Sequence, residues 1–442
     1  MRAHRLAISA NRAIAQPAAP LLASARPIPR SNVSPRPSLL LSASKSRFPS
    51  HRSFTATTST RSDGAAGEPR KTVLYDFHLK HGGKVVPFGG YSMPLSYSSL
   101  GQVASHHHTR NSASLFDVSH MVQHHFEGPG AGDFLEWLTP SSVKKLGEHQ
   151  GSLSLLLNFG GGILDDLIIT KITDNKFYVV TNAGRRSEDL AWIAERLAEW
   201  KEQGKGEVKH TILEDQGLIA LQGPKAVEAL AKHTDADLTK LTFGKSVYAT
   251  VAGVPNCHIV RGGYTGEDGF EISVSPEETE KVSEALLAED TVELAGLAAR
   301  DSLRLEAGMC LYGNDLDETV GPAEGGLTWV VAKDRREKGD FIGSERVLKE
   351  IKEGPTRRRV GVVVEGAPAR GGALLYASDQ PEYIGMITSG IPSPTLGKNI
   401  AMAYVKNGYH KRGTKLEVEV RGKRREAVVE KMPFVENKFF RG

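Results

Sequence analysis

Apolar and polar positions follow two different periods along this chain. From Ser187 to Gln203 the apolar residues recur at helical spacing, which predicts an amphipathic helix with Ser187 as its N-cap and Gly204 at its C-terminal end. A second helix is predicted to start at Ser275-Pro276, because proline is favoured in the first turn of a helix. A third is predicted after Gly223-Pro224.

Most of the other apolar residues lie in short β-branched runs, at residues 177–180, 217–221 and 360–364. Residues 415–420 alternate between charged and apolar side chains before a turn at 421–423, which predicts a hairpin with one face in water. Strands with occasional helices favour an α+β fold, and no strand is followed by a GxGxxG dinucleotide-binding turn. The stretches at residues 334–340 and 349–359 are rich in charge. We interpret them as a linker to a C-terminal all-β module.

Composition separates the N-terminus from the rest of the chain. Residues 1–62 hold ten of the 56 basic residues and no acidic residue, and they are rich in Ser, Ala and Pro. This composition predicts a transit peptide at residues 1–60, although a basic tail that stays attached would have the same composition. The remainder carries 46 basic against 52 acidic residues, so we expect no nucleic-acid partner. No run of 18 apolar residues occurs, so we expect no membrane span.

Two glycine-flanked segments place carboxylates beside apolar runs, where an unpaired charge is costly. Asp165 and Asp166 lie in a predicted strand, so one side chain should point inward and the other toward a turn or solvent. A buried Asp could accept a proton from an attacking amine, and a turn Asp that bonds its own backbone fits the local sequence equally well. In residues 261–271, Glu271 follows a glycine-rich turn; it could bind a ligand with several N–H donors or lie on a surface hairpin.

Other polar residues carry weaker signals. Arg300 and Arg304 are one helical turn apart, which fits either a solvated ion-paired face or a ligand contact. Cys257 and Cys310 match no disulfide framework or metal spacing, and we interpret Cys310 as a small buried hydrophobic residue. Histidines cluster at positions 106–108, 120, 124 and 125, but no nearby Glu or Cys completes a metal site with them. We therefore expect them to be surface or core residues that bind no metal.

In their order, these segments resemble the aminomethyltransferase, or T-protein, family of the glycine cleavage system, from about Thr72 to Phe440. Each landmark alone is weak, but together and in family order they are specific. The landmarks are LYDFH at 74–78, SLFDVSHM at 114–121, GGILDDL at 161–167, LQGP at 221–224, YTGEDGFE at 264–271, ARDSLRLEAG at 299–308, LYGND at 311–315 and SGIPSP at 389–394.

The resemblance implies an α+β fold of three domains arranged like a clover leaf, with two interleaved mixed α/β domains and a C-terminal β barrel. It implies that a lipoylated partner, the H-protein, carries an aminomethyl group whose one-carbon unit passes to tetrahydrofolate, a co-substrate. The products would be ammonia and 5,10-methylenetetrahydrofolate. The transit peptide then indicates the mitochondrial matrix, and no flavin is implied. The implied domains are a folate-binding domain at 71–125 with 212–312, a second domain at 126–211 with 313–348, and the barrel at 349–442.

The resemblance also carries over individual site residues. Asp166 matches a family carboxylate near the folate nitrogens, where an ionised acid can orient the attacking amine and stabilise positive charge without a raised pKa. Glu271 matches the pterin-binding glutamate, and Arg300 matches a substrate-binding arginine.

Three further positions are less certain or depart from the family. Tyr264 and Asn182 align with segments near the ligand. A C-terminal position that is often Tyr in relatives is Phe439 here, which keeps an aromatic ring for stacking but lacks the hydroxyl group.

Two other functions occur on related folds. A folate-linked demethylating oxidase would carry a flavin domain upstream, where this chain has the basic segment. A non-enzymatic folate protein of iron–sulfur cluster maintenance has a Lys-Gly-Cys-Tyr/Phe-x-Gly-Gln-Glu motif, which residues 308–315 do not match. Basic residues cluster at 335–338, 357–359 and 421–425. These clusters could attract an acidic H-protein during docking, or they could be ordinary solvated surface.

Overall fold

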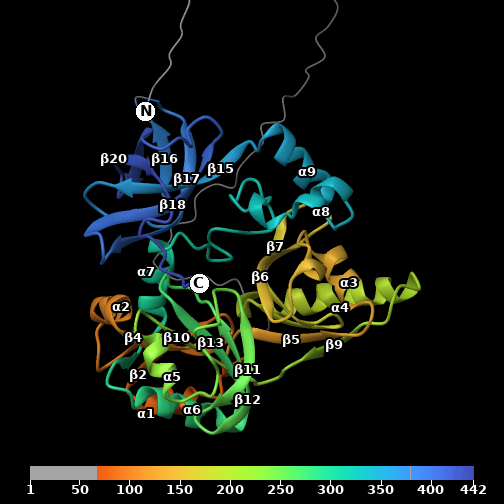
Figure 1. Cartoon of the computed structure of the whole chain (residues 1–442). Coiled ribbons are helices and arrows are strands. Elements are labelled where there is room, and N and C mark those ends of the chain that lie inside the picture. The colour runs from red at the N-terminus through yellow and green to blue at the C-terminus, as the bar shows by residue number, and fades with distance from the viewer. Residues whose placement is uncertain (1–66, 379) are drawn as a thin grey trace, which may run out of the picture. The chain divides into compact units, whose positions relative to one another are not determined.

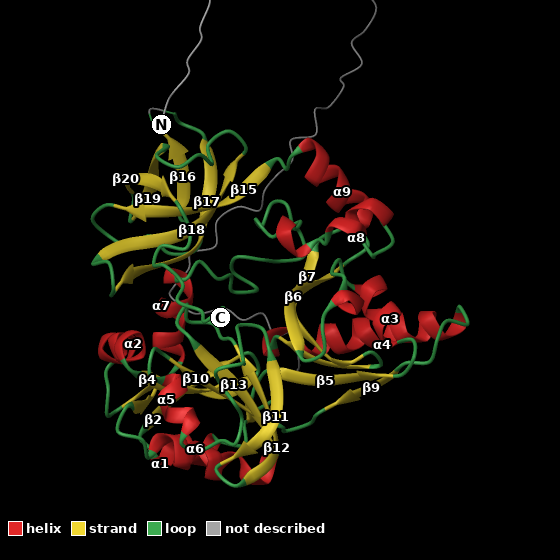
Figure 2. Ribbon diagram, viewed as in Figure 1, coloured by secondary structure: helices red, strands yellow, loops and turns green. Residues whose placement is uncertain are grey.

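The strands of the described residues, 67–378 and 380–442 of a computed structural model, form four sheets (Figures 1 and 2). The expected transit peptide at 1–60 lies outside the described residues. The smallest sheet has three strands, in the order β1 (Arg70–Lys71), β3 (Tyr91–Tyr97) and β2 (Gly83–Phe88).

A six-stranded sheet holds Glu271 and strands of the SLFDVSHM and LQGP segments. Its central strand β10 is buried at every residue, because β13 and β4 flank it and side chains pack on both faces. Helices α1 (Tyr75–Lys80), α5 (Ala226–Ala231) and α6 (Thr279–Leu287) pack their apolar residues into this core. The strand order is β11 (Ser246–Val251), β12 (Val254–Arg261), β13 (Gly269–Val274), β10 (Gly217–Gln222), β4 (Ala113–Asp117) and β14 (Val292–Leu294).

A five-stranded antiparallel sheet packs against α3 (Ala131–Leu138) and the predicted amphipathic helix, α4 (Arg186–Glu202). Ile193 and Trp200 of α4 are buried in that core, as the helical spacing predicts. Ser187 is not the N-cap: a 3-10 turn at Ala183–Arg185 runs directly into the helix, so Ser187 lies inside its first turn. The strand order is β6 (Gln150–Leu157), β7 (Ile163–Thr173), β8 (Lys176–Thr181), β5 (Val122–Glu127) and β9 (Lys209–Ile212).

The C-terminal strands close into a six-stranded barrel, which confirms the predicted all-β module. The predicted hairpin is β19 and β20, with Leu416, Val418 and Val420 inside the barrel. Side chains alternate between the interior and water along β19, as a barrel wall requires. The order around the barrel is β15 (Arg357–Val364), β18 (Lys398–Lys406), β17 (Tyr383–Ser393), β16 (Leu374–Ala377), β19 (Lys415–Val420) and β20 (Lys423–Glu430).

The predicted charged linker is wrong. Most of it forms two helices, α8 (Lys333–Lys338) and α9 (Ser344–Glu353). Val347 of α9 is fully buried, and Arg335 of α8 is 2 % exposed with an ion pair to Asp340 at 2.7 Å. The density of charge concealed one narrow apolar face on α9, which is enough to anchor a short helix. No helix in the described part of the chain is long and apolar enough to cross a bilayer.

Helix α7 (Leu297–Glu306) connects the sheets to the barrel (Figure 1). It packs against α2 (Gln102–Asn111), β3 and the barrel strands β17 and β18. Leu305 lies in one apolar cluster with Ile391, Ile400 and Met402 of the barrel. The helix that carries Arg300 is therefore fixed from several sides.

Candidate active site

The two neighbouring aspartates of β7 face opposite sides, as the strand pleat predicts. Asp165 is 0 % exposed, whereas Asp166 is half-buried. Asn182 follows β8, the neighbour of β7, and its backbone N–H and side-chain amide each donate to Asp165 at 2.9 Å. The same amide donates to Oδ1 of Asp166 at 3.1 Å. Asn182 therefore holds both carboxylates in one arrangement.

The surroundings of Asp166 favour its protonated form more than expected. Burial and the negative charge of Asp165 raise the pKa of Asp166 to about 7, although the hydrogen bond from Asn182 opposes that shift. The sequence expectation required no raised pKa at this carboxylate. With a pKa near neutrality, Asp166 can exist in either state and can both accept and return a proton.

Glu271, Arg300 and Tyr264 form the second half of the site. The Arg300 guanidinium lies 4.7 Å from the centre of the Tyr264 ring, and its Nη1 is buried without a hydrogen-bond partner. Burial raises the pKa of Glu271, while the charge of Arg300 opposes the shift. Burial also lowers the pKa of Arg300, with Glu271 opposing. A buried donor without a partner and a carboxylate on which its charge acts are suited to a polar ligand.

Tyr264 connects the two halves of the site. Burial raises the pKa of its hydroxyl group, and the charges of Asp166 and Arg300 both act on that group. The hydroxyl donates to the backbone carbonyl of Cys310. Burial raises the pKa of the Cys310 thiol to about 12, so this residue behaves as the small hydrophobe that its surroundings suggested. Among the predicted site residues, Asn182 therefore contacts Asp166, and Arg300 contacts Tyr264.

Phe439 lies at the C-terminal segment, which attaches near the same turn. Its ring stacks on Phe243 with centroids 4.3 Å apart. The backbone N–H of Lys438 donates to Gly266 at 2.8 Å, and the N–H of Phe243 donates to Phe440 at 2.8 Å. Among the described residues, no hydrogen bond joins Phe439 to the other predicted site residues.

Three of the six clustered histidines are core residues. His106, His120 and His124 are all buried, and no cluster of three metal-binding side chains occurs in the described residues. His124 lies in strand β5, so its helical spacing from His120 has no structural meaning. Burial lowers the pKa of His120 to about 4, and the charge of Arg300 adds to the shift, although Asp117 opposes it. His120 was not predicted as a site residue, although it belongs to the SLFDVSHM landmark.

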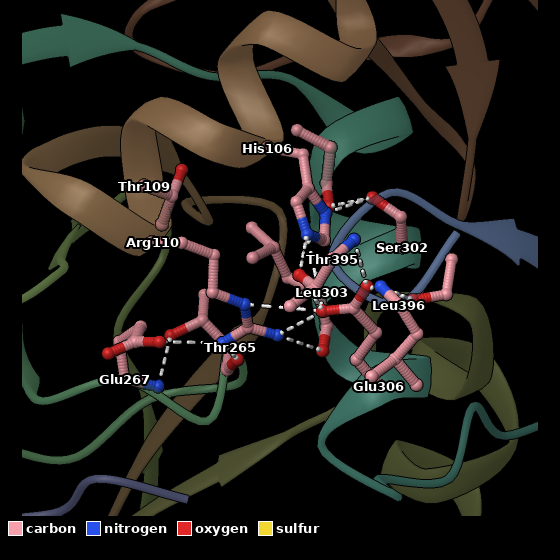
Figure 3. A network of polar contacts seen from close by, with 12 residues as sticks. His106, Thr109, Arg110, Thr265, Glu267, Ser302, Leu303, Glu306, Thr395 and Leu396 are labelled. Atoms are coloured by element: carbon pink, nitrogen blue, oxygen red, sulfur yellow. Dashed lines mark hydrogen bonds and ion pairs between the residues drawn. The ribbon is translucent and has the colours of Figure 1, made fainter. Parts of the chain in front are cut away.

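A buried ionic network supports the turn that carries Tyr264 and Glu271 (Figure 3). Arg110 of α2 donates to Glu306 of α7 at 2.8 Å, to Glu267 at 3.0 Å and to the Thr265 carbonyl at 2.7 Å. Glu306 also lies 3.2 Å from His106 and accepts a hydrogen bond from Thr395 at 2.7 Å. The network joins α2, α7, the turn and the barrel. No local sequence pattern indicates this network, because Arg110 is separated from Thr265, Glu267 and Glu306 by 155, 157 and 196 residues.

Comparison with known proteins identifies the family. The model described as the GCVT N-terminal domain matches residues 74–335, and the glycine cleavage T-protein C-terminal barrel domain matches residues 357–436. The chain belongs to the glycine cleavage T-protein family. It is 46% identical to the probable mitochondrial aminomethyltransferase of Schizosaccharomyces pombe over 86% of this chain and 96% of the relative. It is 47% identical to the mitochondrial aminomethyltransferase of Homo sapiens, over 84% and 91%.

The T-protein fold is confirmed by a solved relative. The crystal structure of glycine cleavage system aminomethyltransferase T from Bartonella henselae matches with a TM-score of 0.78 and 39% identity. The match covers 84% of this chain and all of the solved chain. This confirms the predicted family, the mixed α+β content and the C-terminal barrel. The alternative families receive no such support.

Proposed function

We propose that this chain is the aminomethyltransferase of the glycine cleavage system. It would transfer the one-carbon unit from the aminomethyl-dihydrolipoyl arm of an H-protein to tetrahydrofolate, and release ammonia. The observation that carries the proposal is the half-buried Asp166, which lies in strand β7, accepts a hydrogen bond from Asn182 and falls within the part of the chain that the T-protein family model matches. The mitochondrial names of its relatives and the basic N-terminus support a place in the matrix.

The residues of the site fit a folate. A pterin ring presents N–H donors on one edge, which suit the Glu271 carboxylate in a charge-assisted pair of hydrogen bonds. It also presents acceptors, which suit the buried and unpaired Nη1 of Arg300. The stacked rings of Phe439 and Phe243 provide an aromatic surface near the same turn. Tetrahydrofolate would supply the nucleophilic nitrogen that takes up the carbon.

Asp166 would act on the reacting nitrogen. As a carboxylate it accepts a hydrogen bond from the attacking amine, which orients the amine toward the methylene carbon. Positive charge develops at that carbon as its bond to the departing nitrogen breaks, and the fixed negative charge of Asp166 stabilises it. Asp166 then accepts the proton that the attacking amine loses, which its pKa near neutrality permits. Two carbon–nitrogen bonds to tetrahydrofolate would form, while the carbon–nitrogen bond to the departing ammonia and the carbon–sulfur bond to the lipoyl arm would break. The two protons that the tetrahydrofolate nitrogens lose would leave on ammonia and on the lipoyl thiol.

The three basic clusters at 335–338, 357–359 and 421–425 do not present all of their charges to an H-protein. Arg335 is buried in ion pairs, and Arg357 pairs with Glu324 at 3.2 Å. The exposed residues Arg421 and Lys423 keep their charge toward solvent. Any electrostatic steering of an acidic partner would depend on exposed basic residues such as these and on Lys338, and would weaken as salt rises.

We propose a division into domains that follows the two large sheets. The six-stranded sheet takes its strands from residues 113–117 and 217–294, and the five-stranded sheet from residues 122–212, which supports two interleaved domains. Because β5 pairs with β8 and β9, the first boundary would lie before Val122 and not after residue 125.

The test is tetrahydrofolate-dependent ammonia release from an H-protein loaded with the aminomethyl group. The wild-type chain should release ammonia, and Asp166→Asn should be slower by about a hundredfold or more. Asp174→Asn, at an exposed turn of the same hairpin, is the matched control. Folate binding without ammonia release from the wild type would indicate a non-enzymatic folate protein instead.

A further inference from the structure

A cavity of about 460 Å³ lies between α3, the C-terminal end of α4 and α8 (Figure 1). Its volume is in the range of small-molecule sites in proteins. Its walls include Trp137 of α3 and Trp200 of α4, whose ring centroids lie 5.6 Å apart. The residues that line it share no member with the site residues predicted from the sequence.

Lys205, in the loop after α4, lies over both of these indole rings. Its Nζ is 4.4 Å from the ring centre of Trp200 and 5.1 Å from that of Trp137. The loop is fixed, because the Trp200 indole N–H donates to the Gly206 carbonyl at 2.8 Å and a side chain at Gly130 would collide with the same carbonyl. Attraction between a cation and an aromatic face stabilises the ammonium group in this place. The charge of Lys205 is therefore already positioned at the cavity wall.

The carboxylates that line the cavity already have cationic partners. Asp340 and Glu136 lie 2.7 Å and 3.8 Å from Arg335, and Asp133 pairs with Lys144. Arg335 is 2 % exposed, and its Nε has no hydrogen-bond partner in the described part of the chain. Each acid of the cavity is therefore matched by a cation, and one buried N–H donor is left over.

Two further cations of the cavity lack such partners. Lys205 and Lys338 are exposed, and neither forms an ion pair with any of the described residues. An unpaired lysine is ordinary on a protein surface, but these two line one cavity together with a pair of indoles. Four basic and three acidic side chains line the cavity in all, so its net charge is positive. Such a charge beside an aromatic wall favours a ligand that is both anionic and flat.

We propose that this cavity binds an aromatic dianion, with a nucleoside monophosphate or the p-aminobenzoylglutamate end of a folate as the two sources of that chemistry. The ring would lie against the half-buried indole of Trp137, because aromatic rings that stack or meet edge to face attract each other. The anionic group would lie beside Lys205 and Lys338 as the counter-ion that both lack. A phosphate monoester, with a charge of about −2 at neutral pH, matches two ammonium groups. This binding site goes beyond the proposed transfer reaction and does not depend on it.

Calorimetric titration with adenosine monophosphate and with p-aminobenzoylglutamate tests the site without any assay of activity. The wild type should bind at least one probe, and the double variant Lys205→Met/Lys338→Met should weaken that binding about tenfold or more. Both lysines are exposed, so the double variant should fold. Lys201→Met, exposed at the same end of α4 but outside the cavity, should leave the affinity unchanged. The probe that loses more affinity in the double variant identifies the source of the ligand.

Further variants test the aromatic wall and the place of binding. Trp137→Leu should weaken binding about fivefold or more, whereas Trp329→Leu, at an indole that is 64 % exposed outside the cavity, should not. Unchanged affinity in Trp137→Leu would overturn the ring contact. The whole inference would be wrong if neither probe bound at millimolar concentration, or if the double lysine variant bound both as well as the wild type. A loss in Arg300→Met as large as in the double variant would place the probe in the candidate active site and would overturn the inference as well.

Discussion

The side-chain amide of Asn182 lies 3.1 Å from Oδ1 of Asp166 and is the side-chain donor that reaches this carboxylate within the described residues. The amide favours the ionised form of Asp166, while burial and the charge of Asp165 oppose that form. The balance of these three effects, and not the aspartate alone, sets the pH at which the site works. Five predictions test this balance and its structural support.

Removing the Asn182 amide should move the pH profile. In Asn182→Ala the ionised Asp166 loses its donor, so its apparent pKa should rise above about 7 and the acidic limb of kcat should shift to higher pH. At the optimum, kcat should fall about tenfold, since a charge-assisted hydrogen bond is lost. Steady-state kinetics across pH measure both effects. Asn175→Ala, on the exposed β7–β8 turn, is the control, and a shift toward lower pH would contradict the assignment.

Asp166 should reduce stability at neutral and alkaline pH. Its pKa is higher in the folded chain than in the unfolded one, so it contributes stability at acidic pH that is lost as pH rises through about 7. Asp166→Asn removes this loss and should raise the free energy of unfolding at about pH 8 by roughly 1–3 kcal/mol. Denaturant unfolding at several pH values measures it. If Asp166→Asn were less stable than the wild type at every pH, ionised Asp166 would not destabilise the folded chain.

Glu271 should act mainly on folate binding. Glu271→Gln replaces a charged acceptor with a neutral amide, which should raise KM for tetrahydrofolate about tenfold or more and change kcat less. Arg300→Met should show the same pattern, because it removes the unpaired Nη1. The exposed Glu277→Gln provides the control. If either variant lowered kcat with an unchanged KM, its residue would belong to the chemical step instead.

The network around Arg110 should stabilise the folded chain and take no direct part in the reaction. Arg110→Met leaves Glu306 buried without its main cation, which should cost about 3–5 kcal/mol in the free energy of unfolding. Lys240→Met removes an exposed ion pair to Asp237 and should have no measurable effect. Unfolding in denaturant distinguishes them. Equal stabilities for the two variants would contradict the structural role.

The same network predicts sensitivity to acid. Burial opposes ionisation of Glu306, but hydrogen bonds from His106 and Ser393 outweigh it and lower the pKa of Glu306 to about 2. A carboxylate with a lowered pKa contributes stability above its ordinary pKa, and that stability is lost as pH falls toward 2. Glu306→Gln should flatten this part of the stability profile.

The sequence by itself determined the family, the α+β class, the barrel hairpin and the inward-outward pair at Asp165 and Asp166. These features depend on local periodicity and on the order of motifs, and both are visible in the amino-acid sequence. Helix α4 was recognisable because its apolar spacing is local, whereas α8 and α9 were taken for a linker because their charge conceals a narrow buried face.

Only the tertiary structure decided the electrostatics of the site. The pKa of Asp166 depends on how deeply β7 is buried and on the position of Asn182. The Arg110 network joins segments far apart in the chain, and no local pattern records which of many charges will be neighbours. Periodicity is a property of neighbours in sequence, but desolvation and charge pairing are properties of neighbours in space.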